Sequence, residues 1–520
     1  MNIGTLLTKS ARSFGANLAM VRGHDVWTYA QFNERTDRLA NALRGLGVRQ
    51  GDHVAILMHN GPQMLEAMFA TFKLGCGAVP INFRLHPSEF AYIIDHSESK
   101  AVFLTPKFNE PFAAQRGQLG GVAHVITVDG AQGDVLDYES LLADSSAEFE
   151  DAQVDPNDVA WLFYTSGTTG QPKGAMLTHR NLLAMTMNFY SDVCPGFGNQ
   201  EAVLHMAPLS HGSGLYALPN IGKAAMNVFG ASDSFDASEV LCLIQDHRIT
   251  NMFAAPTMIK RLVDAPNVGD YDLSSLKALI YGGGPTLAQD LKKAMRTLGP
   301  CLVQLYGLGE SPMTITYLRH EDHVVEGNER QMKRLSSAGI ARTDVQIAIV
   351  DDDDHELSSG QTGQIVTRSD LVMKGYWRNP QASADTLKRG WLHTGDIGYI
   401  DSDGYLFIMD RSKDMIISGG ENIYPREIEE VLIEHPAVGE VAVIGVPDEQ
   451  WGEAVKAVVV PINGQTVSEA ELISMCKDRI ASYKKPKSID FVDELPKNNY
   501  GKLVKKDLRD RYWQGRERSV

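Results

Sequence analysis

Residues 159–174 join an apolar run to a loop that is rich in glycine and hydroxyl side chains. The run Val159–Tyr164 has the length and composition of a buried strand. It leads into Thr165–Gly174, which holds three glycines, four hydroxyl side chains and Lys173. Backbone N–H groups and hydroxyls in such a loop donate to phosphate oxygens, and the ammonium group adds a positive charge. The segment therefore predicts a phosphate-binding loop at the end of a strand, with a flexible surface turn as the alternative.

Two other kinds of phosphate loop are excluded by the spacing. Lys173 is followed by Gly174, where the loop of nucleotide triphosphatases has Ser or Thr. Gly167 and Gly170 do not form the G-x-G-x-x-G pattern of dinucleotide-binding folds.

Strand-like and helix-like segments alternate along the first 340 residues. Helices are expected over residues 27–48 and near Met64–Leu74. The strand-like runs are Asp52–Met58, Ala78–Ile81, Ala101–Thr105, Val125–Val128, Val159–Tyr164 and Ala278–Tyr281. This alternation predicts an α/β fold, with layered βαβ subdomains and parallel sheets.

The pattern changes after residue 338. Short strand-like runs at Val345–Val350, Gly363–Thr367 and Tyr405–Met409 predict a small β-barrel-like subdomain. The acidic run Asp351–Asp354 between two of them is interpreted as a solvated hairpin turn and not as a metal site.

A domain boundary is expected near Asp410–Asp414. We predict a large N-terminal domain over residues 1–411 and a small α+β domain over residues 412–520. The expected elements of the small domain are helices at Pro425–Glu434 and Ser468–Ala481 and strands at Glu440–Gly445 and Val455–Val460.

Charge and cysteine content narrow the classes of function. The formal net charge of −16 argues against general nucleic-acid binding. Residues 477–520 are an exception, with 13 Lys/Arg against 7 Asp/Glu. This tail is interpreted either as a site that attracts an anionic ligand or as a solvated basic helix. The five scattered cysteines, the lack of a signal-peptide core and the lack of an 18-residue apolar run predict a cytoplasmic protein without a membrane span.

Three further segments place polar residues and glycines after strand-like runs. Met206–Leu215 contains His211, which suits a substrate pocket, although a lone histidine is more often structural. Tyr281–Pro285 and Gln304–Glu310 would lie at the carboxyl ends of strands, where open α/β sheets bind ligands. There Tyr306 offers a stacking face, and Glu310 is either a ligand of Mg²⁺ or a helix-capping carboxylate. In Gly390–Asp396 the final aspartate is either a ribose acceptor or a local turn former.

Taken together and in this order, these motifs resemble those of the acyl-adenylate-forming enzymes. This superfamily includes acyl-CoA synthetases, peptide-synthetase adenylation domains and beetle luciferases. The resemblance runs from about residue 25 to 510, and it includes Arg411–Glu427 and the closing segment Pro496–Lys502. The acyl-CoA synthetase branch is favoured by Asp448–Glu453, and the basic tail fits the phosphates of coenzyme A.

The resemblance implies a role for each matching residue. Lys502 would be the adenylation lysine, Glu310 and Thr165 would hold Mg²⁺, and Lys413 would be the hinge of a mobile C-terminal domain. The residues implied to be catalytic are Lys502, His211, Glu310 and Lys173. The nucleotide and coenzyme would be held by Thr165, Ser166, Gly167, Thr168, Thr169, Gly170, Gly282, Gly283, Gly284, Pro285, Tyr306, Gly307, Asp396, Arg411, Gly419 and Gly420. The acyl pocket would be lined by His211, Gly212, Ser213, Leu215, Gly283, Leu305 and Met313.

One position departs from the family pattern. Gly309 stands where the family usually has a threonine whose hydroxyl contacts the α-phosphate. A water molecule or Ser311 would have to replace that hydrogen bond, which is worth about 1.5–3 kcal/mol.

Three functions remain open at this point. The first is an ATP- and Mg²⁺-dependent acid–CoA ligase, the second a free-standing adenylation domain that loads a carrier-protein thiol, and the third a non-catalytic nucleotide-binding relative. Phe235–Ser238 looks like the amine-binding motif of amino-acid adenylation domains, but Asp236 and Glu239 are better interpreted as a capping box of a helix over Glu239–His247. Amino acids are therefore not expected as substrates.

The acid is expected to be an aromatic or medium-chain monocarboxylic acid. Gly212, Ser213 and Gly214 predict room beside His211, and apolar residues would form the walls. Leu305 replaces the glycine common in coumarate–CoA ligases, so an extended aryl chain would be obstructed. No arginine lies in the matched pocket segments, which disfavours a malonate-type substrate. Similar enzymes are often dimers, so the resemblance allows a homodimer.

Overall fold

The computed structural model describes residues 1–165, 171–284, 288–324, 326–418, 421–448, 451–497 and 503–514. The chain divides into two compact units. The first comprises Met1–Ile347 and Thr367–Leu392, and the second comprises Ala348–Val366 and His393–Val520. The boundary predicted between residues 411 and 412 marks where the C-terminal part would rotate, and the division into two units does not test it. This boundary stays a prediction.

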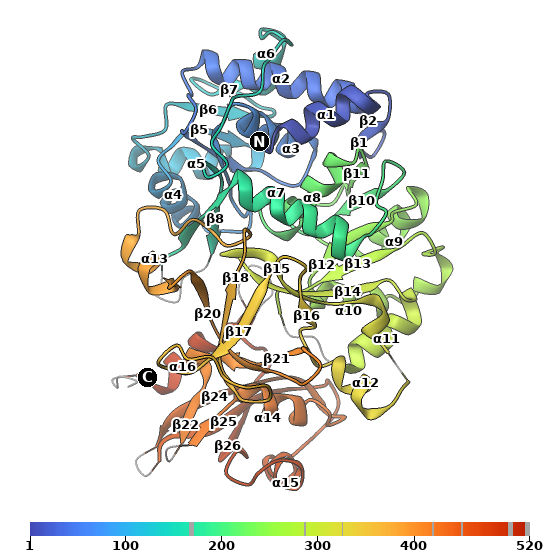
Figure 1. Ribbon diagram of the computed structural model, residues 1–520, viewed down its shortest axis with the longest axis vertical. Helices are drawn as coiled ribbons and strands as arrows, with labels where there is room; N and C mark the ends of the chain where they lie inside the picture. Colours follow the sequence, from blue (N-terminus) through green and yellow to red (C-terminus); the bar gives the residue numbers. More distant parts are fainter. Residues whose placement is uncertain are drawn as a thin grey trace. The chain divides into compact units, whose positions relative to one another are not determined.

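The larger sheet of the first unit is parallel in its centre and antiparallel at both edges (Figure 1). Its nine described strands, in spatial order, are β16 (Ile340–Ala341), β15 (Ser311–Leu318), β14 (Leu302–Leu308), β13 (Ala278–Tyr281), β12 (Asn251–Ala254), β10 (Ala202–His205), β11 (Met226–Phe229), β1 (Leu18–Arg22) and β2 (Asp25–Thr28). Strands β14 to β1 run parallel, so their carboxyl ends share one edge.

The second sheet of this unit ends in an antiparallel hairpin. Its seven described strands, in order, are β7 (Leu136–Asp137), β6 (His124–Thr127), β5 (Ser99–Leu104), β3 (His53–Leu57), β4 (Gly77–Pro80), β8 (Val159–Thr165) and β9 (Lys173–Thr178). All neighbours are parallel except β8 and β9. The α/β class predicted from the alternation of segments is confirmed.

Helices cover both faces of these sheets. Helices α3 (Pro62–Lys73) and α7 (His179–Asn188) contact strands of both sheets, and α8 (Gly212–Gly222) contacts α7 and the larger sheet. The outer helices are α9 (Ala237–Asp246), α10 (Pro256–Val263) and α11 (Ala288–Leu298) on the larger sheet and α4 (Pro87–His96) and α5 (Asn109–Gln115) on the smaller one. The unit also contains α1 (Thr5–Phe14), α2 (Tyr29–Gly45), α6 (Tyr138–Ala143), the π-helix Phe189–Val193, α12 (Glu329–Arg334) and α13 (Pro380–Thr386).

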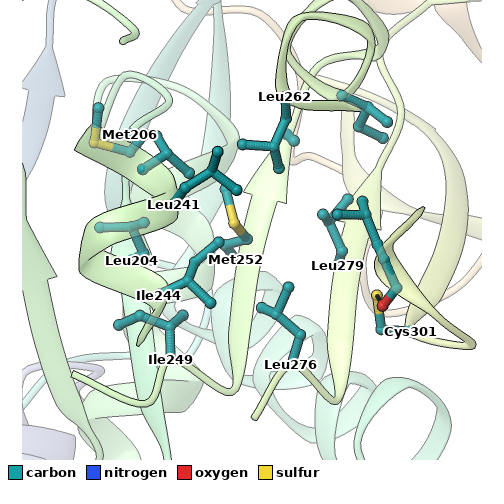
Figure 2. Packing of buried hydrophobic residues seen from close by; sticks show 14 of the residues in the cluster. Leu204, Met206, Leu241, Ile244, Ile249, Met252, Leu262, Leu276, Leu279 and Cys301 are labelled. Carbon is teal, nitrogen blue, oxygen red and sulfur yellow. Dashed lines mark hydrogen bonds between the residues drawn. The ribbon is translucent and has the colours of Figure 1, made fainter. Parts of the chain in front are cut away.

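The core between the larger sheet and its outer helices follows from helical periodicity. Leu241 and Ile244 recur on one face of α9, and both are fully buried. They pack on Leu204 of β10, Met252 of β12 and Leu279 of β13, as Figure 2 shows. Burial of each such side chain stabilises the fold by about 1.5–3 kcal/mol, so this contact holds the strand ends that carry the candidate site in place.

The strands predicted after residue 338 belong to one five-stranded sheet. Its strands are β17 (Gln346–Val350), β18 (Gly363–Arg368), β20 (Trp391–Ile400) and β19 (Leu387–Lys388), with β21 (Leu406–Arg411) paired to β20. The acidic run 351–354 is a turn, because the Asp351 carboxylate accepts hydrogen bonds from the backbone N–H groups of Asp353 and His355, both at 2.9 Å.

The C-terminal part is a small α+β fold, as predicted. Its sheet contains β23 (Glu421–Ile423), β22 (Ile416–Ser418), β25 (Gly452–Pro461), β24 (Val438–Asp448) and β26 (Ser488–Phe491), and its helices are α14 (Pro425–Leu432), α15 (Glu469–Arg479) and α16 (Lys505–Tyr512).

Candidate active site

The predicted phosphate loop connects the two strands of the β8–β9 hairpin. Thr165, the last residue of β8, is paired with Lys173, the first residue of β9. Both residues therefore flank the mouth of the loop. The residues between them that were predicted to bind phosphate, Ser166, Gly167, Thr168, Thr169 and Gly170, lie outside the described residues.

Tyr376 links Lys173 to Glu310. Its hydroxyl donates a 2.6 Å hydrogen bond to Glu310 Oε1, and Lys173 Nζ lies 5.3 Å from the centroid of its ring. The segment around Tyr376 is held against β9 by backbone hydrogen bonds, such as Trp377 N–H to the Gly174 carbonyl at 2.8 Å. Tyr376 was not predicted from the sequence. It lies in the segment Gly375-Tyr376-Trp377, which belongs to none of the motifs that were matched to the family, so the sequence offered no reason to select it.

Glu310 lies in the turn between β14 and β15. Its backbone carbonyl accepts from Met373 N–H at 2.8 Å. The helix-capping alternative for this residue is therefore wrong, because the turn belongs to a β-hairpin. Within the described ranges, the second carboxylate oxygen has no hydrogen-bond partner. A carboxylate with one oxygen that accepts no hydrogen bond can bind Mg²⁺, because this ion is commonly bound through one or two carboxylates, water and substrate phosphates. No cluster of three acidic, His or Cys side chains that could hold a metal occurs in the described part of the chain.

The glycines predicted to frame adenine lie at the ends of two neighbouring parallel strands. Gly282, Gly283 and Gly284 follow β13, whereas Tyr306 and Gly307 lie within β14. A Cβ atom on Gly282 would lie 2.5 Å from the carbonyl oxygen of Leu305, so the two strands approach too closely there for any side chain. Pro285 lies outside the described residues.

His211 occupies the N-cap position of α8 without a capping hydrogen bond from its side chain, and its ring packs on Phe163 with centroids 5.2 Å apart. The expectation of room beside it is wrong. A Cβ atom on Gly212 would lie 2.4 Å from Met313 Cε and 2.8 Å from Phe253 Cε1. The missing side chain thus lets two apolar side chains approach.

The remaining predicted wall residues are buried. Ser213 Oγ and His205 Nδ1 are 2.8 Å apart, and Leu215 and Leu305 are almost fully enclosed. Met313 has a left-handed backbone with φ of 61°, which is uncommon for a residue other than glycine. Its backbone comes so close to Gly307 that a Cβ atom there would lie 2.5 Å from Met313 Cα.

The absence of a side chain at Gly309 has a steric explanation. A Cβ atom there would lie 2.4 Å from Thr165 Cγ2 and 2.8 Å from Phe163 Cδ1. Phe163 and Thr165 therefore occupy the space that the usual threonine would need. Ser311 is fully buried, and its hydroxyl lacks a hydrogen-bond partner in the described structure, so its contact with the α-phosphate stays a prediction.

The residues implied to hold the ribose belong to the second unit. Asp396 of β20 is paired with Arg411 of β21, and only 5% of its surface is exposed. The Thr394 hydroxyl accepts from Asp396 N–H at 3.1 Å and donates to the Ile365 carbonyl at 2.8 Å. Asp396 thus lies in a strand next to Gly395, which has a φ of 72°, and it does not itself form the turn. The side chain of Arg411 is outside the described structure.

Lys413, the predicted hinge, lies in the 3₁₀ turn Ser412–Asp414. Beside it, burial raises the pKa of Asp414, but the Arg509 guanidinium outweighs this effect and holds the pKa below its ordinary value. Lys505 is held 2.9 Å from a Glu429 carboxylate oxygen. Gly419, Gly420 and Lys502 lie outside the described residues.

Six of the 13 basic residues in the tail are paired with acidic side chains of the same unit. Its ion pairs are Arg479–Glu434, Lys484–Glu427, Lys487–Asp448, Lys497–Glu440, Lys505–Glu429 and Arg509–Asp414. Neither predicted interpretation, a site for an anionic ligand or a solvated basic helix, describes these six residues. The count of charges in residues 477–520 did not include the acidic side chains outside this segment that pair with them.

The motif at Phe235–Ser238 begins a helix, as expected. Asp236 caps α9 by accepting from Glu239 N–H at 2.8 Å. The capping box is not completed, because the Glu239 carboxylate accepts from the backbone N–H groups of Ala231 and Ser232.

Comparison with known proteins identifies the family. The sequence profile of the AMP-binding enzyme matches residues 7–377, and that of the AMP-binding enzyme C-terminal domain matches residues 427–502. The chain belongs to the AMP-binding enzyme family. The resemblance to acyl-adenylate-forming enzymes of the acyl-CoA synthetase branch is confirmed.

Similar proteins match this chain over almost its full length. A feruloyl-CoA synthase from an Amycolatopsis species is 38% identical over 98% of this chain and 99% of the relative. An indoleacetate–CoA ligase from Aromatoleum aromaticum is 37% identical over 93% and 92%. The crystal structure of ATP-bound MatB from Rhodopseudomonas palustris superimposes with a TM-score of 0.88 at 30% identity, covering 98% of both chains. In the described residues of our protein, no helix combines the length and apolar character that a membrane span requires.

Gly309→Thr is expected to slow ATP–pyrophosphate exchange by about 10- to 100-fold. The new side chain would turn Thr165 and shift its hydroxyl, and displacements of this size at a reacting centre cost rates of that order. Adding Phe163→Leu and Thr165→Ser removes both obstacles and should restore part of the rate. A single variant as active as the native enzyme would contradict this account.

Tyr376→Phe is expected to raise the Mg²⁺ concentration needed for half-maximal exchange by about tenfold, because Glu310 loses a hydrogen bond to its charged group. Tyr138→Phe is the matched control, since the Tyr138 hydroxyl donates to Glu66 at the same 2.6 Å but lies outside the candidate site. Binding of Mn²⁺ with a non-hydrolysable ATP analogue, measured by paramagnetic resonance, gives a second readout. Equal shifts in both variants would refute the role of Tyr376.

Proposed function

We propose that this protein is an ATP-dependent acid–CoA ligase. It would activate a carboxylic acid as acyl-AMP with release of pyrophosphate and then transfer the acyl group to the thiol of coenzyme A. The observation that carries the proposal is the convergence of Lys173, Tyr376 and Glu310 beside the β8–β9 loop. Family membership and full-length similarity to named CoA ligases support it.

In the first half-reaction, a carboxylate oxygen of the acid attacks the α-phosphorus of ATP, and pyrophosphate leaves. Negative charge grows on the phosphate oxygens, and preorganised cations stabilise it. We assign this role to Lys173 beside the loop and to Lys502. His211 would orient the acid, and Thr165 with residues 166–170 would donate to the phosphates.

Glu310 is proposed as the principal protein ligand of Mg²⁺, with the Thr165 hydroxyl beside it. The ion would neutralise phosphate charge when bound. Tyr376 holds the Glu310 carboxylate in a fixed orientation, so the ligand is positioned before ATP arrives.

Two sets of residues are proposed to bind the nucleoside. Gly282–Gly284 with Tyr306 would frame adenine, because backbone without side chains admits a flat ring. Asp396 would accept from the ribose hydroxyls, and Arg411 would assist it.

In the second half-reaction, the thiol of coenzyme A attacks the acyl carbonyl, AMP leaves with the electron pair of the broken bond, and the thiol proton passes to solvent. We propose that rotation of residues 412–520 about Lys413 withdraws Lys502 and brings Gly419 and Gly420 to the thiol. This alternation is supported by the family and by the separate compact fold of the C-terminal part.

The acid is proposed to be an aromatic or medium-chain carboxylic acid. The buried apolar walls formed by Leu215, Leu305 and Met313 suit such a substrate. The feruloyl and indoleacetate relatives support the aromatic choice.

We propose a cytoplasmic location, supported by five cysteines that are all free thiols. Burial raises the pKa of Cys301 and Cys476 to about 11, which keeps these thiols protonated and unreactive. A homodimer is proposed from the resemblance alone and is tested by sedimentation.

Thiol-dependent release of AMP tests the function. The enzyme is incubated with ATP, Mg²⁺ and graded aromatic and aliphatic acids, and AMP is measured with and without coenzyme A. Release that requires coenzyme A supports the proposal. Release only with a phosphopantetheinyl carrier protein would instead favour a loading domain, and a lack of pyrophosphate exchange with every acid would favour a non-catalytic relative.

Lys502→Ala is expected to reduce adenylation about 10²- to 10³-fold, because a preorganised charge at the transition state is lost. Thioester formation from supplied acyl-AMP should be largely retained. Lys506→Ala is the control, since this lysine is exposed on α16. Equal loss of both half-reactions would contradict the assigned role.

A further inference from the structure

Arg342 is a buried cation without an anionic partner. It follows β16, and its backbone N–H donates to the Ile315 carbonyl of β15 at 3.2 Å. Only 2% of its surface is exposed. Its Nε, Nη1 and Nη2 atoms are all buried and have no hydrogen-bond partner in the described structure.

The other buried cations in the described part of the chain are paired. Lys73 is 1% exposed and lies 2.6 Å from Asp37, and Arg509 is 9% exposed and is paired with Asp414. Arg342 has no carboxylate within 4 Å among the residues that the structure describes. A buried guanidinium that lacks an acceptor is strongly unfavourable, so such a group indicates a bound partner that is not part of the protein.

The surroundings of Arg342 are aromatic. Its guanidinium carbon lies 4.8 Å from the centroid of the Tyr317 ring. The guanidinium also adjoins the buried hydroxyl of Tyr216, which is a neutral neighbour and has no hydrogen-bond partner in the described structure. Burial raises the pKa of Tyr216 to about 12, with Arg342 acting in the opposite direction, so this hydroxyl is a neutral donor.

Two further titratable groups face this region from the segment that follows α7. Burial raises the pKa of the Cys194 thiol to about 12, so this group is neutral. The Asp192 carboxylate is occupied by Thr343 and Ser191. Among the described residues, Asp192 forms no ion pair with Arg342, and Glu201, the other carboxylate that acts on Cys194, is paired with Lys277 at 2.7 Å.

Tyr216 connects Arg342 with the proposed acyl pocket. It lies one helical turn after Gly212 on the same face of α8, and its ring stacks on Phe253 with centroids 5.9 Å apart. Phe253 is, with Met313, one of the two side chains that close on Gly212 beside His211. Tyr216 is five positions after His211, which corresponds to about 7–8 Å along the helix axis.

We propose that Arg342 and Tyr216 bind an oxygen group at the far end of the acid substrate, about 7 Å beyond the carboxylate that is activated. The substrate would then be a carboxylic acid with a second oxygen acceptor, either a ring oxygen opposite the acid chain or a distal carboxylate. This inference rests on the proposed function and makes it more specific. The matched pocket segments contain no arginine, whereas Arg342, directly after β16, lies outside them.

The test compares matched acids. The pairs are 4-hydroxycinnamate with cinnamate and octanedioate with octanoate. The native enzyme is expected to prefer the oxygen-bearing member of one pair by at least about tenfold in kcat/KM, because a site built for a hydrogen bond rejects the analogue that lacks it. The preferred pair tells whether the oxygen is phenolic or carboxylic.

Arg342→Met should abolish this preference by lowering kcat/KM for the oxygen-bearing acid alone. Arg342→Lys, which keeps the charge, should retain part of it, and Tyr216→Phe should weaken it. Arg248→Met, at an exposed arginine, is the control. Free Arg342→Met is also expected to melt no lower than the native enzyme, and its stabilisation by the oxygen-bearing acid with a non-hydrolysable ATP analogue should be lost.

An equal loss for both members of each pair would overturn the inference, as would a native enzyme that prefers neither oxygen-bearing acid. In either case, coenzyme A-dependent AMP release from cinnamate or octanoate would leave the proposed function intact. Failure of every acid to release AMP would instead reject the function itself.

Discussion

The hydrogen bond between Tyr376 and Glu310 connects three segments that are far apart in the chain. Glu310 lies in a hairpin turn of the larger sheet, Tyr376 follows the strand β18, and Lys173 begins β9 of the smaller sheet. Since one aromatic side chain contacts both charged groups, the cation and the carboxylate are placed before any ligand binds. Preorganisation of this kind is what a phosphoryl-transfer site requires, because charges that are already in place need no reorganisation during the reaction.

Close approach between backbones limits the rest of the site. Gly282 and Gly307 each face a neighbouring strand at a distance that admits no side chain, and Gly309 faces Thr165 and Phe163. At Gly309, Thr165 and Phe163 together fill the volume that a threonine side chain would need. Because these three residues are in contact, the effect of a substitution at one of them depends on the other two.

Local pattern carried much of the fold and of the site. The apolar run before Thr165, the alternation along the first 340 residues and the small C-terminal fold were all predicted, because strand and helix periodicity are local properties. Tyr376 was not predicted, since only the folded chain brings it to Glu310. The expectation of space beside Gly212 was wrong because a missing side chain can equally admit a neighbour, and Met313 is a distant one. Arg342 was not predicted either, because the sequence does not show whether an arginine side chain is buried or paired with a carboxylate.

Met313 combines a left-handed backbone with a flexible thioether that closes on Gly212 and Phe253. A left-handed residue with a side chain carries a conformational penalty of roughly 1–2 kcal/mol that glycine does not. Shortening this residue to glycine would therefore relax the main chain and vacate volume at the same time. Enlarging a cavity usually weakens a protein, but here the two effects partly offset each other. Evolution could thus widen the range of accepted acids at this position with little loss of thermodynamic robustness.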